Sequence, residues 1–237
     1  MRRHHPTLIL LTASMALTAG APSLAAKPPA KPAQTAKATP AKPKPRKKPR
    51  PKKKKPTRAE IIAHNDDTIA HLTRVPITGV TWRRIVIHHT ATGAGSVANI
   101  SAYHKKRFND PDGIQYHFLI GNGRGHPNGW IALGRWPLQK RAIHLFRPNR
   151  APDAIAVSLV GNFETRKLGD AQYQATVRLV TALCRAYGID PAMITTHRRV
   201  DGRLTQCPGK HFPYERLVRD VRARLAAPAR QEITPAP

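Results

Sequence analysis

Residues 84–90, RIVIHHT, are the stretch on which the fold of this chain depends. Three β-branched apolar residues, 85–87, are followed directly by two histidines. β-Branched residues favour strands, and an apolar run without polar alternation is typical of a strand that is covered on both faces. The stretch therefore predicts a buried strand over residues 84–88 that delivers an imidazole group at its C-terminal end.

A second stretch, residues 196–209, reads THRRVDGRLTQCPG and carries His197 and Cys207 ten residues apart. Neutral imidazole and thiolate are both good ligands for zinc. Because two ligands do not hold a catalytic metal, a third must come from elsewhere, and His88 at the end of the apolar run is the best donor. Two histidines and one cysteine leave a fourth position for water, which is typical of catalytic rather than structural zinc.

The same residues allow plainer interpretations, which stay open at this point. A histidine beside an apolar strand is more often hydrogen-bonded than metal-bound. Cys207 is alternatively an inert thiol or half of a disulfide with Cys184. We expect no disulfide, because Cys184 shares an apolar stripe, at helical spacings of three and four residues, with Tyr173, Val177, Val180 and Tyr187.

The rest of the folded part alternates between helical and strand patterns. Helix-capping signals at Thr57, Ser96, Asp170, Gly188 and Pro213 predict helices over 58–72, 96–108, 170–188 and 213–225. Strands are predicted over residues 84–88, 116–121, 130–134, 141–145, 154–160 and 193–196. Strands interleaved with helices predict an α/β fold with a single mixed central β-sheet that is flanked by helices.

Composition divides the chain into four parts. Residues 1–26 have a basic start, an apolar core and small residues at the end, which predicts a secretory signal peptide. Residues 27–57 contain nine prolines, thirteen lysines or arginines and no acidic or aromatic residue, which predicts a disordered Lys/Pro-rich linker. Residues 58–226 form the folded domain, with a core over about 80–222, and residues 227–237 a flexible C-terminal tail. We therefore expect a secreted or periplasmic protein of the cell envelope.

The net charge of +28 is not confined to the linker. Residues 58–237 hold twenty-six lysines and arginines against thirteen acidic residues. A surface this positive attracts polyanions through fields that salt screens. In a secreted context we expect anionic wall or membrane polymers as partners of the linker, rather than a specific nucleic acid.

Five motifs resemble one known family in residue type, order and separation. They are IVIHHTA at 85–91, QYHFLIGNGR at 115–124, AIHL at 142–145, AIAVSLVGNF at 154–163, and THRRV with TQCPG within 196–209. The chain resembles the peptidoglycan recognition protein and type 2 N-acetylmuramoyl-L-alanine amidase family over roughly residues 80–222. The resemblance implies the peptidoglycan recognition protein-like amidase fold and a Zn²⁺ ion held by His88, His197 and Cys207.

The resemblance also implies roles for residues around the metal. Tyr116 and Thr205 match family positions near the zinc, where a phenol and a hydroxyl would orient water and hydrogen-bond the oxyanion of amide hydrolysis. A strand-borne core aromatic is the alternative for Tyr116. His144 matches a histidine of the substrate cleft, with a solvent-facing strand residue as the alternative, and we predict that His89 also contacts substrate.

Two departures from the family pattern lie close to these residues. The family usually has Asp-Ile-Gly before the tyrosine, where this chain has Gly113, Ile114 and Gln115. The aspartate that usually follows His-Arg is replaced by Arg199. Such changes alter the shape of the cleft and the groups around a metal, which tune its affinity.

The predicted function is zinc-dependent hydrolysis of the amide bond between N-acetylmuramic acid and L-alanine in peptidoglycan, by a monomeric enzyme. Two alternatives remain: a non-catalytic peptidoglycan-binding module, which the family contains where the cysteine is lost, and a basic polyanion-binding protein. Retention of His88, His197 and Cys207 favours the enzyme over the binding module.

Overall fold

The computed structural model describes residues 54–72, 80–138, 140–141 and 144–227. The predicted signal peptide, nearly all of the predicted linker and all but the first residue of the predicted tail lie outside the described residues. Within the described part, no helix combines the length and the apolar character that a membrane crossing requires.

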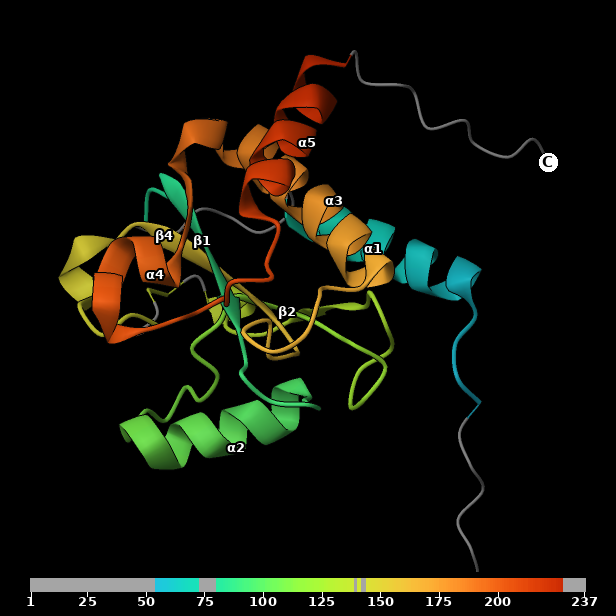
Figure 1. The fold of residues 1–237 in the computed structure, drawn as a ribbon. Coiled ribbons are helices and arrows are strands. Elements are labelled where there is room, and N and C mark those ends of the chain that lie inside the picture. Colours follow the sequence, from blue (N-terminus) through green and yellow to red (C-terminus); the bar gives the residue numbers. More distant parts are fainter. Residues whose placement is uncertain (1–53, 73–79, 139, 142–143, 228–237) are drawn as a thin grey trace, which may run out of the picture. The chain divides into compact units, whose positions relative to one another are not determined.

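A mixed sheet forms the centre of the domain (Figure 1). It has five strands in the order β3-β2-β4-β1-β5. The strands are β1 (Arg84–His89), β2 (Phe118–Ile120), β3 (Ile131–Leu133), β4 (Ala154–Leu159) and β5 (Ile194–Thr196). β1 lies parallel to both β4 and β5, β2 lies parallel to β4, and only β3 runs antiparallel to its neighbour. The predicted mixed central sheet is confirmed.

One predicted strand is wrong. Residues 141–145 were expected to join the sheet, but Arg141, His144 and Leu145 have no strand conformation, and residues 142 and 143 lie outside the described residues. Leu145 is nevertheless buried, in a small cluster with Val86, Ala151 and Ala154. The apolar character of this segment therefore reflects packing onto a face of the sheet and not pairing within it.

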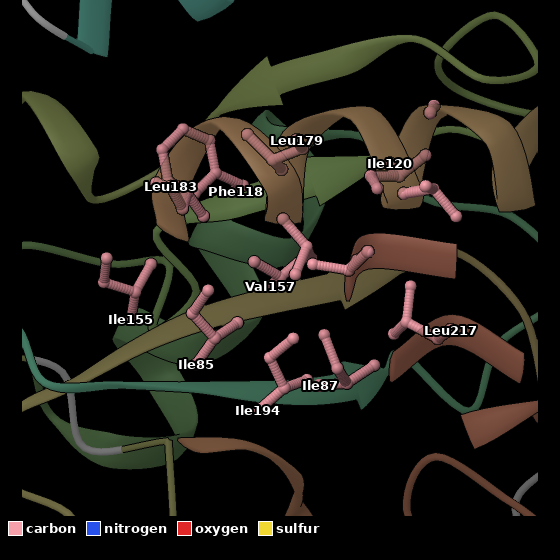
Figure 2. Close-up of a cluster of buried hydrophobic side chains, with 14 of the residues drawn as sticks. Ile85, Ile87, Phe118, Ile120, Ile155, Val157, Leu179, Leu183, Ile194 and Leu217 are labelled. Atoms are coloured by element: carbon pink, nitrogen blue, oxygen red, sulfur yellow. The ribbon is translucent and has the colours of Figure 1, made fainter. Parts of the chain in front are cut away.

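Helices on one face bury the larger core. Ile85 and Ile87 of β1 and Val157 of β4 pack against Leu179 and Leu183 of α3 (Asp170–Tyr187), as Figure 2 shows. Leu217 of α5 (Tyr214–Ala226) completes this cluster, and α1 (Arg58–Leu72) contacts α3 and β3. Because side chains alternate along a strand, β1 presents positions 85, 87 and 89 to this face.

The opposite face of the sheet carries smaller clusters. Val86 packs with Leu145 there, and Leu119 and Val160 pack with Ile100 of α2 (Val97–Phe108). The side chain of His88, which follows Val86 by two residues, belongs to this second face. Burial on both faces explains why β1 and β4 read as continuous apolar runs.

The predicted helix ends are mostly confirmed. Thr57 and Glu60 exchange the reciprocal hydrogen bonds of a capping box, and the Ser96 hydroxyl accepts from Asn99 N at the start of α2. Asp170 is the first helical residue of α3, and Gly169 is its N-cap. Tyr103 on α2 is 62% exposed, whereas His104 is buried and Val97 and Ile100 pack against the sheet.

Two short elements come directly after β5. α4 (His197–Asp201) begins at the residue after β5, and the 3-10 turn η4 (Gly202–Leu204) follows it. Three further 3-10 turns, η1 (Trp136–Leu138), η2 (Pro148–Arg150) and η3 (Pro191–Met193), lie in the connections.

Candidate metal centre

Strand register brings two of the predicted ligands together. In the parallel pair of β1 and β5, Ile87 lies opposite Thr196. The next residues along the two strands are His88 and His197, so both imidazoles leave the same edge of the sheet. Their ring centroids are 4.8 Å apart, and both residues are buried.

Cys207 reaches the same edge from the loop that follows η4. Its Sγ lies 3.2 Å from the backbone N of His89, which donates to it, and 3.7 Å from Nδ1 of His88. The loop lies close to the residues that follow β4, because Gly209 packs directly onto the backbone of Phe163. A Cβ added at Gly209 would lie 2.2 Å from the carbonyl carbon of Phe163. The glycine of the Cys-Pro-Gly motif is thus required by a backbone contact that places the cysteine.

The three donors have the geometry of a metal site. One ligand atom each from His88, His197 and Cys207 lies within 4.8 Å of the others. Tetrahedral zinc with typical Zn–N and Zn–S distances separates nitrogen from sulfur by about 3.6 Å. The 3.7 Å between Cys207 Sγ and His88 Nδ1 agrees with this value. His88, His197 and Cys207 therefore fit Zn²⁺ in both donor type and spacing.

The second nitrogen of each histidine has its own partner. His88 Nε2 lies 2.8 Å from Nδ1 of His144, and His197 Nε2 lies 2.9 Å from Oδ2 of Asp201. Histidines that bind metals usually donate their other N–H in this way, which fixes the ring and its tautomer. In both residues Nδ1 is then the nitrogen that is left to bind a cation.

Burial keeps both imidazoles neutral. It lowers the pKa of His88 well below 6.5, and the neighbouring His144 and His197 lower it further. Burial also lowers the pKa of His197, although Asp201 opposes the shift. A neutral imidazole is the form that binds metal.

The thiol of Cys207 depends on a cation for its charge. Burial raises the pKa of Cys207 to about 12, although the hydrogen bond from the His89 backbone N–H opposes the shift. A metal ion in contact with the sulfur stabilises the thiolate and removes this penalty.

Tyr116 and Thr205 lie beside the cluster. The ring of Tyr116, two residues before β2, is 5.4 Å from the ring of His88 by centroids. Burial raises the pKa of Tyr116 above its usual 10, and proximity to Cys207 raises it further. The hydroxyl of Thr205 accepts from Cys207 N at 3.0 Å, and its own proton is free to donate.

His144 and His89 occupy different positions. His144 lies in the loop before η2, buried and directly against His88. The ring of His89 points to the face with the larger core, where its Nδ1 accepts from Phe163 N at 3.2 Å. Their predicted contacts with substrate stay predictions.

Two residues near the metal donors were missed from the sequence. Asp201 contacts His197, and the ring of Phe146 lies 5.3 Å from that of His197 while remaining 63% exposed. Asp201 follows His197 by four residues, a spacing that places two side chains on one side of a helix and gives a usable signal. Phe146 carries no comparable signal.

A carboxylate also supports the segment before Tyr116, where the family's aspartate is absent. The Gln115 side chain donates to Asp110, as does the buried Arg135, and Gln115 N donates to His104 Nδ1 at 3.0 Å. Asp110 therefore fixes the approach to Tyr116 from five residues upstream of Gln115.

Comparisons with known proteins identify the family of the chain. The family model N-acetylmuramoyl-L-alanine amidase (Amidase_2) matches residues 78–210, more than half of the chain. Among curated protein sequences, none matches.

Several solved structures are similar. The endolysin N-acetylmuramoyl-L-alanine amidase LysCS from Clostridium intestinale is 29% identical, with a TM-score of 0.51 over 63% of this chain and 86% of that one. The amidase LysC from the same organism is 28% identical, with a TM-score of 0.51 over 65% and 91%. Drosophila peptidoglycan recognition protein SD is 24% identical, with a TM-score of 0.48 over 58% and 80%. The family match shows that the chain belongs to the N-acetylmuramoyl-L-alanine amidase family.

Proposed function

We propose that this protein hydrolyses the amide bond between N-acetylmuramic acid and L-alanine in peptidoglycan, with Zn²⁺ bound by His88, His197 and Cys207. The observation that carries the proposal is the convergence of these three buried donors within 4.8 Å, in a chain of the amidase family. The similarity to LysCS and LysC, which are named as amidases of this specificity, supports it.

The reaction adds water across one amide bond. The C–N bond breaks, the lactyl carbonyl of the sugar becomes a carboxylate, and the alanine nitrogen leaves as an amine. Zinc supplies water activation near neutral pH and polarisation of the carbonyl. The reaction also needs donors that stabilise the oxyanion and a proton for the leaving nitrogen, and both must come from groups near the metal donors.

Tyr116 suits the role of a hydrogen-bond donor. Because its pKa is raised, the phenol keeps its proton at neutral pH and can donate to the developing oxyanion. The Thr205 hydroxyl, which accepts from Cys207 N, suits the role of a second donor.

A polar pocket lies where the chain leaves the C-terminal ends of β1 and β4. It measures about 300 Å³ and is lined by hydroxyl, amide and basic groups that include Thr92, Asn122, Asn162 and Arg166. These groups suit a glycan that carries a peptide with carboxylates.

The test is product analysis on purified sacculi. The proposal predicts new α-amino groups on alanine and release of stem peptides, lost with a chelator and restored by zinc. New reducing sugar ends without alanine amines would instead identify a glycosidase. Binding to sacculi without any released product would identify a non-catalytic binding module.

We also propose that the protein acts outside the cytoplasm and that residues 27–57 hold it near anionic wall or membrane polymers. The sequence of residues 1–57 supports both statements. Attraction through thirteen basic side chains weakens as salt rises. Deleting residues 27–53 should therefore reduce cosedimentation with sacculi at low salt and leave cleavage of soluble muropeptides unchanged. Equal cosedimentation of both forms at low salt would contradict the role of the linker.

A further inference from the structure

We propose that Asp201 is a positioning residue of the metal centre: its carboxylate holds His197 in the tautomer and orientation that present Nδ1 to zinc. The inference rests on the proposed zinc site. It concerns a residue that lies outside the motifs by which the chain resembles its family.

The first support is the direct contact within α4. His197 and Asp201 begin and end this five-residue helix, four positions apart, and Asp201 Oδ2 lies 2.9 Å from His197 Nε2. A carboxylate oxygen only accepts, so Nε2 carries the ring proton and the lone pair stays on Nδ1. With the opposite tautomer, the carboxylate would face a lone pair.

The second support is that the carboxylate is itself held. Phe146 N donates to the same Oδ2 at 2.7 Å, from a loop 55 residues earlier in the chain. Asp201 is 2% exposed, so no bulk water competes for these hydrogen bonds. The Phe146 ring also lies beside the His197 ring, with 5.3 Å between the ring centroids.

The third support is energetic. Oδ1 of Asp201 is buried and has no hydrogen-bond partner in the described part of the chain. Burying a carboxylate oxygen without a partner costs free energy of folding. A requirement of the metal site gives a reason to keep a buried carboxylate here in spite of this cost.

The departure from the family pattern supports the same role. Position 199, where the family usually has an aspartate, is an arginine whose guanidinium pairs with Glu215 and covers the Tyr214 ring. Arg199 therefore points its charge away from the metal donors. The carboxylate next to His197 comes from two residues further along the chain.

The first experiment measures zinc affinity by competition with a chromogenic chelator. Removing a group that orients a metal-binding histidine typically weakens affinity 10–100-fold, and we expect a loss in this range for Asp201→Ala. Asp201→Asn retains an acceptor oxygen and should lose less. Asp153→Asn is the matched control, because Asp153 pairs with Arg84 at the opposite end of β1 and β4.

Urea unfolding of the zinc-free proteins separates positioning from folding. Asp201→Ala should unfold at a lower urea concentration than the wild type, because Phe146 N and His197 Nε2 lose their buried acceptor. The zinc affinities are therefore compared without urea, where both proteins are folded. Zinc affinity of Asp201→Ala within twofold of the wild type would overturn the proposal. If Asp201→Ala does not fold, the tautomer of His197 in the wild-type chain decides instead.

A second experiment uses only the wild-type chain. Nitrogen-15 NMR of the zinc-free protein should report His197 as the Nε2–H tautomer, and an Nδ1–H tautomer would overturn the proposal. A wild-type chain that binds no zinc overturns the proposed function as well. Zinc binding that is indifferent to Asp201 overturns the present inference alone.

Discussion

Replacement of one oxygen atom tests the role of Tyr116. Tyr116→Phe removes the hydroxyl but keeps the ring against His88 and His104. Loss of one donor to an oxyanion typically costs about 10²–10³ in kcat. We expect a fall of this size on a soluble muropeptide, with KM changed little and zinc content unchanged. Full kcat in Tyr116→Phe would exclude the hydroxyl from the reaction.

Single residues of the site differ in how far the sequence predicts them. His88 and Cys207 are marked by local context, since one ends an apolar run and the other lies in a Cys-Pro-Gly turn. Phe146 and His144 act through contacts with residues more than 45 positions away. Such contacts follow from the docking of a loop onto the sheet, which no local pattern encodes.

The two ends of α3 give a matched pair of substitutions. Gly188 ends the helix with φ 62°, in open space, so that Ala there meets no clash but adopts a left-handed conformation. Gly188→Ala should destabilise the protein by about 1 kcal/mol. Gly169, the N-cap, has φ −79° and no side-chain cap, and Gly169→Ser should stabilise by about 0.5 kcal/mol through a new hydrogen bond.

Urea unfolding of both variants checks these signs. A stabilising Gly188→Ala would show that the helix end relaxes into another conformation. No gain in Gly169→Ser would show that the serine hydroxyl does not reach the first turn of α3.

Elements with strong local signals were predicted well. The capping box at Thr57 and the terminal Gly188 each satisfy backbone groups at the end of the same element, so local sequence suffices. The strand at 141–145 failed because Leu145 satisfies its apolar character against Val86, across the face of the sheet. Apolar alternation records burial, and burial does not require strand pairing.

The whole molecule should lose stability in acid partly through His117. This fully buried ring accepts from Ala156 N at Nδ1 and donates to Lys140 O from Nε2, which requires the neutral form. Burial lowers the pKa of His117 to about 4. Below pH 6.5, His117 binds a proton in the unfolded chain but not in the folded chain. The free energy of unfolding therefore falls as the pH drops from about 6.5 to 4, and His117 contributes about 3 kcal/mol to this fall.

Comparison with His117→Gln isolates this contribution. The free energy of unfolding, measured in urea at several pH values, should fall less steeply between pH 6.5 and 4 in the variant than in the wild type. Parallel curves over this range would mean that folded His117 accepts its proton as readily as the unfolded chain.

At the scale of the whole molecule, the sequence predicts the class of the fold but not the order of the strands in the sheet. Helical and strand patterns that alternate along the chain predict a mixed sheet with helices around it, and the structure has such a sheet. The order β3-β2-β4-β1-β5 depends on pairings such as Ile87 with Thr196, which join residues more than 100 positions apart. The position of His197 beside His88 is a consequence of that register.

The central claim is that three side chains hold a zinc ion that the enzyme needs. Metal content by mass spectrometry, measured on the chain purified without added metal, tests it most directly. We predict about one zinc per chain in the wild type and none in Cys207→Ala. Cys184→Ala is the control and should also hold about one zinc, because Cys184 is a residue of α3 that is buried in the hydrophobic core. Zinc retained at full occupancy by Cys207→Ala, or absent from the wild type, would contradict the account.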